Sequence, residues 1–241
     1  MFFGGYYWLL IPGILLALWA QWKVSATFAK YSQVPAASGL TGAEVARDIL
    51  QRAGADFDTQ SGSTAATLAL RAIQVEPTAG NLTDHYDPRS RVLRLSETVY
   101  SSNSLAALGV AAHETGHALQ HATGYAPLGL RSTLVPAANI GSTLAFPLFF
   151  IGLIFGGNHL LMDIGILFYV AAVAFTLITL PVEFNASRRA IVMLREGGYL
   201  RPDEVGPSKA VLDAAALTYV AAAAMAILNL IRLLLIRNER D

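Results

Sequence analysis

The sequence predicts a mainly α-helical integral membrane protein with four transmembrane helices and a small α+β domain on the cytoplasmic side. Of its 241 residues, 54% are hydrophobic and 14% are charged, whereas soluble proteins carry about 25% charged residues. The mean hydropathy is +0.46. Four apolar stretches approach or exceed the roughly 20 residues that cross the hydrocarbon core of a bilayer.

These apolar stretches divide the chain. We expect the first to remain as an anchor, because Lys23 and Lys30 follow it, whereas a cleaved signal peptide has its basic residues in front. Aromatic residues near its ends are typical of a membrane interface. The predicted spans are Phe2–Ala20, Leu134–Phe155, Ile164–Val182 and Val211–Ile231. The predicted parts are an anchor (1–20), a cytoplasmic domain (21–133), a transmembrane hairpin (134–182), a cytoplasmic helix (183–210) and a last transmembrane helix with a tail (211–241).

The distribution of Lys and Arg predicts the orientation. Of the seventeen basic residues, nine lie in 21–133 and five in 183–210, while the turn 156–163 has none. Four spans place 21–133 and 183–210 on one side, and the positive-inside rule makes this side cytoplasmic. We therefore expect a multi-pass plasma-membrane protein with both chain ends outside.

Two helices are expected in the domain formed by 21–133. The segment 41–44 (Thr-Gly-Ala-Glu) has the pattern of a capping box, which begins an amphipathic helix, and Gly54 suits its end. Asn103 or Ser104 can cap a second helix that runs to about Ala122.

The same domain has three candidate strands. Residues 67–75 alternate between polar and apolar as a strand does. Residues 82–86 and 91–95 flank Asp-Pro-Arg-Ser at 87–90, a good β-turn sequence, and so predict a β-hairpin.

Charge and cysteine content exclude several functions. The formal net charge is zero, which gives no electrostatic support for a nucleic-acid partner. There is no cysteine, so disulfides, thiolate metal sites and cysteine nucleophiles are all excluded. Any metal must be held by histidine and carboxylate.

The second predicted helix contains His113-Glu114-Thr115-Gly116-His117. Residues four apart lie on one face of a helix, so His113 and His117 can bind a single metal ion. Glu114 between them is then placed to take a proton from water. This pattern is typical of zinc-dependent peptidases and predicts that the cytoplasmic α+β domain is zincin-like.

A catalytic zinc ion takes three protein ligands, and three residues are candidates for the third. His121 lies about 12 Å beyond His113 along a straight helix, which is too far unless the helix breaks early. His85, on the first hairpin strand, could be a ligand, an oxyanion stabiliser, a substrate contact or a structural residue. Glu183 follows two spans after His117, so it emerges on the same side of the membrane; alternatively it pairs with Arg188 or Arg189.

The chain resembles the YugP family of bacterial membrane zinc metallopeptidases. The resemblance rests on A-A-H-E-T-G-H-A around His113, P-V-E-F-N-A-S-R-R-A around Glu183, and L-T-D-H-Y-D-P at 82–88. The layout is more distantly similar to the HtpX and CAAX prenyl protease superfamily, where the third zinc ligand is the glutamate of an E-x-x-x-D helix. The resemblance implies that His113, His117 and Glu183 bind Zn²⁺ and that Glu114 is the general base.

The sequence departs from that pattern at one position. The aspartate of E-x-x-x-D falls at Ser187, a weaker partner for orienting a zinc ligand. Asn185 and Asp84 are both candidates to take its place.

The expected function is hydrolysis of peptide bonds in membrane or membrane-adjacent proteins by a membrane-embedded endopeptidase. Oxyanion stabilisation is expected from the metal together with a donor, for which the candidates are His85, Tyr86, Arg188 and Arg189. The expected partners are protein or peptide substrates and the lipid bilayer, with a membrane regulatory partner or a homo-oligomer left open.

Two other functions fit parts of the sequence. A zinc-binding but inactive scaffold would explain Ser187. A metal transporter would need ionisable ligands inside the spans, which carry almost none.

Overall fold

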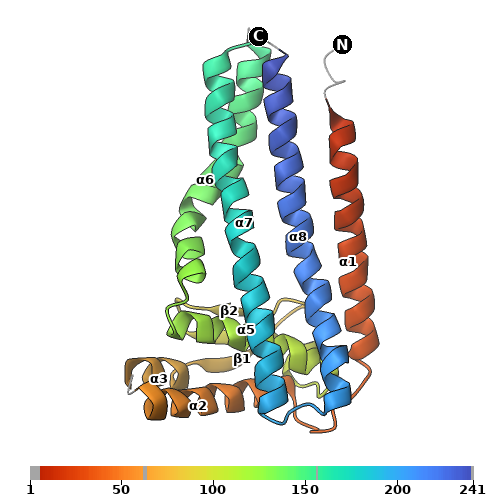
Figure 1. Ribbon diagram of the computed structural model, residues 1–241, viewed down its shortest axis with the longest axis vertical. Coiled ribbons are helices and arrows are strands. Elements are labelled where there is room, and N and C mark those ends of the chain that lie inside the picture. The colour runs from red at the N-terminus through yellow and green to blue at the C-terminus, as the bar shows by residue number, and fades with distance from the viewer. Residues whose placement is uncertain (1–5, 62–63, 156, 240–241) are drawn as a thin grey trace. The chain divides into compact units, whose positions relative to one another are not determined.

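The computed structural model describes residues 6–61, 64–155 and 157–239 (Figure 1). The chain is mainly helical, with one small sheet. In order, the elements are η1 (Tyr7–Leu10), α1 (Ile11–Tyr31), α2 (Gly42–Ser61), α3 (Thr64–Arg71), β1 (Gln74–Thr78), β2 (His85–Asp87), β3 (Val92–Ser96), α4 (Glu97–Tyr100), α5 (Leu105–Ala122), α6 (Ala126–Ile154), α7 (His159–Glu196) and α8 (Pro202–Asn238).

The chain forms two compact units. The first comprises Met1–Trp22, Pro127–Val182 and Leu217–Asp241, and the second comprises Lys23–Ala126 and Glu183–Ala216. Helices α1, α6, α7 and α8 are long and apolar enough to cross a membrane, which confirms the four predicted apolar helices. Helices α7 and α8 extend beyond both ends of their predicted apolar stretches, and α6 ends one residue before Phe155. In the first stretch the helical residues begin at Tyr7, and Phe2–Gly5 lie outside the described residues.

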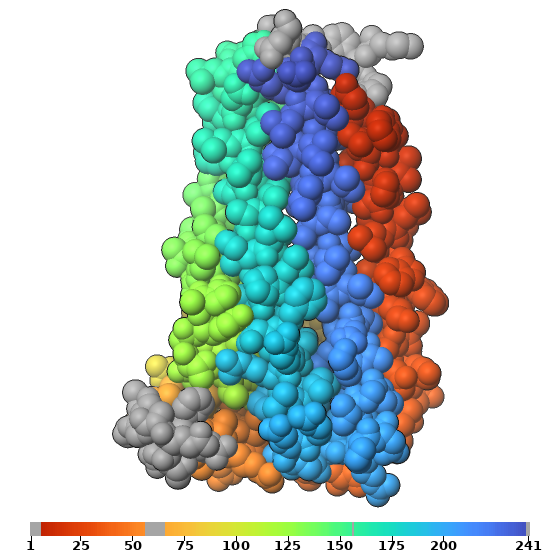
Figure 2. All heavy atoms as spheres, viewed as in Figure 1, coloured from red at the N-terminus to blue at the C-terminus, as the bar shows by residue number. Residues whose placement is uncertain are grey.

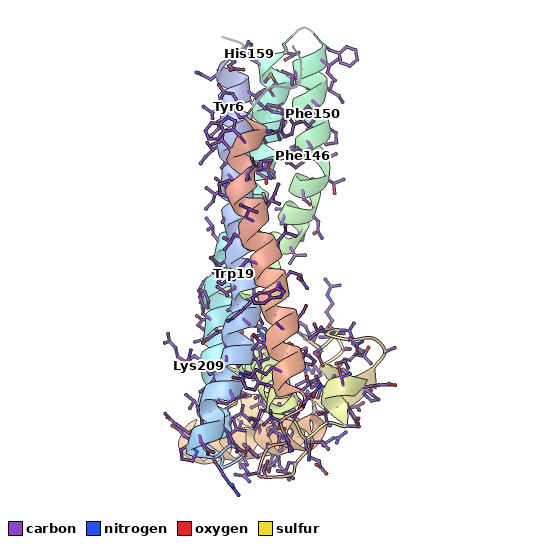
Figure 3. All side chains as sticks on the ribbon, turned by 90° about the vertical axis from the view of Figure 1, so that its right-hand side faces the viewer. Tyr6, Trp19, Phe146, Phe150, His159 and Lys209 are labelled. Atoms are coloured by element: carbon purple, nitrogen blue, oxygen red, sulfur yellow. The ribbon has the colours of Figure 1, made fainter. Side chains whose placement is uncertain are left out.

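The first unit exposes most of its apolar surface. Figure 2 shows α7, α8 and α1 side by side along one face of this unit. Only 11% of the most apolar window of the first helix is buried, and the other three reach 22–28%. Trp19 is labelled on α1 in Figure 3 and is 47% exposed. Large exposed apolar side chains on every helix are what a lipid environment accommodates.

A small aromatic cluster packs α6 against α7 within the first unit. Phe146 and Phe150, labelled on α6 in Figure 3, stack with ring centroids 6.4 Å apart, and Phe146 also meets the Tyr169 ring of α7 edge-on. Gly165 allows α6 and α7 to approach closely, since a Cβ there would lie 2.7 Å from the carbonyl oxygen of Ala145.

The second unit contains a three-stranded sheet of order β1-β3-β2. Strand β1 is parallel to β3, and β2 is antiparallel to it, which confirms the predicted hairpin. Asp87 holds the hairpin loop, accepting hydrogen bonds from the Arg89 N–H and the Ser90 hydroxyl. The first hairpin strand begins at His85, later than predicted, because Leu82 has φ 57°, outside the β region.

The predicted end of α2 is wrong. Its capping box is present: the Thr41 N–H donates to Glu44 Oε2 (2.8 Å) and the Glu44 N–H donates to Thr41 Oγ1 (3.3 Å). The helix does not stop at Gly54 but continues to Ser61. Gly54 serves packing instead, because a Cβ there would lie only 3.2 Å from Cγ of Arg71.

The predicted strand 67–75 is wrong over most of its length. Residues up to Arg71 form α3, and the strand occupies Gln74–Thr78. The segment is rich in alanine and leucine, which favour helices. Thr67 and Leu70, three residues apart, are its buried positions, so the helical period prevails over the apparent alternation.

Helix α5 is the buried centre of the second unit. Ser104 caps it as predicted, accepting a hydrogen bond from the Ala107 N–H. One face of α5 packs with α2 and the sheet. Another contributes Leu105, Leu108 and Ala112 to a core that includes Ala190 and Leu194 of α7. These contacts fix α5 against the C-terminal part of α7.

Candidate metal centre

Two histidines converge on one face of α5. His113 and His117 are one helical turn apart, and their rings meet edge-on with centroids 4.8 Å apart. Both side chains are 13% exposed. The spacing therefore brings the two Nε2 atoms to the same point, as the sequence predicts.

Glu183 of α7 supplies a carboxylate at this point. Its Oε2 lies 3.3 Å from Nε2 of His113 and 3.5 Å from Nε2 of His117, and its side chain is only 2% exposed. The three side chains offer ligand atoms that all lie within 4.8 Å of one another. A buried carboxylate facing two imidazoles is the His₂Glu donor set of a catalytic zinc site, so these residues fit a zinc ion.

The surroundings of His117 favour a positive charge. Burial by itself would lower the pKa of this imidazole. The nearby carboxylates of Glu183 and Glu114 stabilise the protonated ring and outweigh burial, so the pKa of His117 is raised. The same negative potential attracts a metal cation.

Gly116, within the motif, brings α5 and α7 together. A Cβ at this position would lie 2.8 Å from the carbonyl oxygen of Ala186, closer than real Cβ atoms approach other atoms. Glycine is therefore required for Glu183, on the preceding turn of α7, to reach the two histidines.

Gly116→Ala is expected to separate α5 from α7 and to weaken metal binding without altering any ligand. Zinc content after purification should fall well below that of the wild type. The matched control is Gly129→Ala on α6, where nothing lies within 4 Å of the added Cβ. Equal zinc in both variants would contradict the proposed role of the close approach.

Further side chains orient the two imidazoles. Nδ1 of His113 lies 3.1 Å from Ser187 Oγ, and Nδ1 of His117 lies 3.0 Å from Gln120 Oε1. Ser187 therefore does contact a histidine at the position where the related pattern has aspartate. Gln120 was not among the predicted site residues, and its only signal in the sequence was its place three residues after His117 on the same helix.

The two suggested substitutes for the missing aspartate lie elsewhere. Asn185 contacts Gln120 rather than a histidine. Asp84 accepts hydrogen bonds from the backbone N–H (2.7 Å) and the hydroxyl of Ser96. Burial raises the pKa of Asp84, and the hydrogen bonds from Ser96 lower it by less. The nearby negative charge of Glu114 raises this pKa further.

Glu114 lies beside the metal-ligand group and is tied to the sheet. Its Oε2 accepts a hydrogen bond from the Tyr86 N–H of the edge strand β2 (3.0 Å), and the residue is 9% exposed. Strand β2 therefore holds the carboxylate in a fixed position.

Three other candidate residues lie outside the group that His113, His117 and Glu183 form among the described residues. His85 is exposed on β2, with Nδ1 2.8 Å from the Thr83 carbonyl oxygen. His121 has Nδ1 3.0 Å from the Tyr86 hydroxyl. Arg188 is exposed on α7.

Comparison with known proteins identifies the family of the chain. Residues 6–238 match the family described as "Putative neutral zinc metallopeptidase". The chain belongs to this family. It is 47% identical over 234 residues to "Putative membrane protease YugP" of Bacillus subtilis (strain 168), covering 97% of each chain. No solved structure matches the chain.

Family membership and the four apolar helices together describe a multi-pass membrane member of a zinc metallopeptidase family. This confirms the resemblance to the YugP family that the sequence motifs indicated.

Proposed function

We propose that the protein is a membrane-embedded zinc endopeptidase that hydrolyses peptide bonds of membrane or membrane-adjacent proteins at the cytoplasmic face. The observation that carries the proposal is the convergence of His113, His117 and Glu183 next to Glu114. These residues come from two helices of one compact unit. That unit combines the motif helix with a small sheet, which supports a zincin-like domain.

The residues divide the chemistry between them. His113, His117 and Glu183 would hold zinc, which when bound polarises the scissile carbonyl and lowers the pKa of water. Glu114 takes a proton from the attacking water and delivers it to the leaving amine. The Tyr86 N–H holds the carboxylate of Glu114 in place for both transfers.

The developing oxyanion needs a hydrogen-bond donor in addition to the metal. We propose His85 or Arg188 for this role. His85 neighbours Tyr86, which contacts Glu114, on the edge strand β2. Arg188 follows Glu183 on α7 and has a permanently charged, exposed side chain.

The proposed cytoplasmic orientation rests on charge. The segments 21–133 and 183–210 carry fourteen of the seventeen basic residues, and the positive-inside rule assigns them to the cytoplasm. In α7, the residues up to Val182 belong to the first unit and those from Glu183 to the second. The proposed metal ligand therefore directly follows an apolar stretch in the chain, which supports substrates in or near the membrane.

Cleavage of tethered peptides tests this function. The purified full-length protein would be reconstituted into liposomes with a mixed-sequence peptide library, presented either on a transmembrane helix or free in solution. We expect faster cleavage of the tethered library, loss of cleavage on chelation, and its return with added zinc. A zinc-loaded protein that cleaves neither library would contradict peptidase activity and favour the inactive scaffold.

A further inference from the structure

A chain of hydrogen bonds leads from His117 away from the candidate metal centre. Gln120 Oε1 lies 3.0 Å from His117 Nδ1, and Gln120 Nε2 donates to Asn185 Oδ1 (3.0 Å). The same Asn185 oxygen accepts a hydrogen bond from Arg189 Nε (2.9 Å). All four residues belong to the second unit, two on α5 and two on α7.

The chemistry of Arg189 fixes the direction of every bond in this chain. A guanidinium can only donate hydrogen bonds, so Asn185 must turn its oxygen, rather than its NH₂ group, toward Arg189. That oxygen then also accepts a hydrogen bond from the NH₂ group of Gln120. Gln120 is thereby forced to present its carbonyl oxygen to His117.

A carbonyl oxygen can only accept, so the proton of the neutral His117 ring must lie on Nδ1. The unprotonated nitrogen is then Nε2, which is 3.5 Å from Glu183 Oε2 and faces the candidate metal position. We propose that Arg189, through Asn185 and Gln120, fixes the Nδ1–H tautomer of His117. Nε2 of His117 is then the nitrogen that can bind the metal. The inference rests on the proposed zinc site and assigns positioning roles to three residues that do not touch the metal.

The other histidine has no such constraint. Its Nδ1 partner is the Ser187 hydroxyl, which can donate or accept. Ser187 therefore orients the His113 ring without selecting its tautomer. The two histidines differ in this respect although they belong to one motif.

Burial makes the direction of these hydrogen bonds costly to reverse. Gln120 is fully buried, and Asn185 and Arg189 are half-buried. If the amide of Gln120 or Asn185 were flipped, two NH₂ groups or two oxygens would face each other. Because Gln120 is buried, water could not readily supply the missing hydrogen bond. Such unsatisfied buried groups are costly.

The test uses full-length protein in detergent, loaded with zinc and labelled with ¹⁵N in histidine. The ¹⁵N shifts of His117, assigned by comparison with His117→Ala, should show Nδ1 protonated and Nε2 bound to metal. Metal bound through Nδ1 of His117 would overturn the proposal.

Zinc affinity of paired variants gives the second readout. Arg189→Met should weaken zinc binding by roughly 10-fold or more, within the range seen when outer partners of a metal ligand are removed. Arg195→Met, which removes the same charge from an exposed side chain further along α7, is the matched control for zinc affinity. Equal affinities of the two variants would overturn the role of Arg189.

Two substitutions at Asn185 separate the effect of its hydrogen bonds from the effect of its packing. Asn185→Asp keeps an oxygen for both Arg189 and Gln120 and should preserve the affinity and the tautomer. Asn185→Leu has a similar size but accepts no hydrogen bond and should lower zinc affinity. Loss of affinity in a folded Asn185→Asp protein would contradict the proposal. If the wild type binds no zinc, the proposed function itself fails, an outcome distinct from those above.

Discussion

Glu183→Ala is expected to remove zinc from the purified protein. The substitution deletes one of three ligands and leaves two imidazoles without the buried carboxylate that lies 3.3 and 3.5 Å from them. The loss of affinity should exceed the roughly 10–100-fold that removal of an outer-shell partner costs. Metal analysis by mass spectrometry, with affinity measured by competition with a chelator, gives the result.

A matched control is available on the same helix. Glu196 lies at the exposed end of α7 and pairs with Arg195, so Glu196→Ala removes an equal charge and should keep the zinc. Full zinc in Glu183→Ala would contradict the proposed ligand set. The third ligand would then be His121 or His85.

Glu114→Gln is expected to abolish peptide hydrolysis while the protein keeps its zinc. Glutamine retains an oxygen that can accept the Tyr86 N–H, so the local structure should persist. It cannot take a proton from water at neutral pH. The rate should fall by about 10²–10⁴-fold, the usual contribution of a general base, which corresponds to about 3–5 kcal/mol of transition-state stabilisation.

The control for this variant is a comparison of two readouts on one sample. Zinc content and thermal stability should match the wild type while cleavage of a tethered peptide library is lost. Cleavage at the wild-type rate by a zinc-loaded Glu114→Gln protein would exclude Glu114 as the base.

Local signals predicted the parts of the structure that local physics determines. The Thr41–Glu44 capping box and the Ser104 cap mark where two helices begin, because each cap uses backbone groups within three residues. The four apolar helices follow from length and hydropathy. The convergence of His113 and His117 follows from helical periodicity.

The errors arose where tertiary packing decides. Gly54 looks like a helix end, but the close approach of Arg71, distant in sequence, makes it an interior contact of α2. Residues 67–71 alternate like a strand, yet they form a helix that buries Thr67 and Leu70.

The outer shell of the candidate site could not be predicted either. Asn185 was a candidate to orient a histidine, but nothing in the sequence indicated Gln120 or its contact with Asn185, which forms where α5 and α7 pack closely at Gly116. The sequence pointed to Ser187 as a weak substitute for aspartate. The structure adds that a hydroxyl and an amide share the task, one for each histidine.

X-ray absorption at the zinc edge is the most direct test of the proposed metal centre. Zinc-loaded wild-type protein should show two imidazoles at about 2.0–2.1 Å together with oxygen ligands at about 2.0–2.2 Å. The predicted result is two imidazoles per zinc in the wild type. In any zinc that Glu183→Ala retains, the signal of the oxygen ligands should change. Three imidazoles per zinc, or a wild-type protein that binds no zinc, would contradict a centre formed by His113, His117 and Glu183.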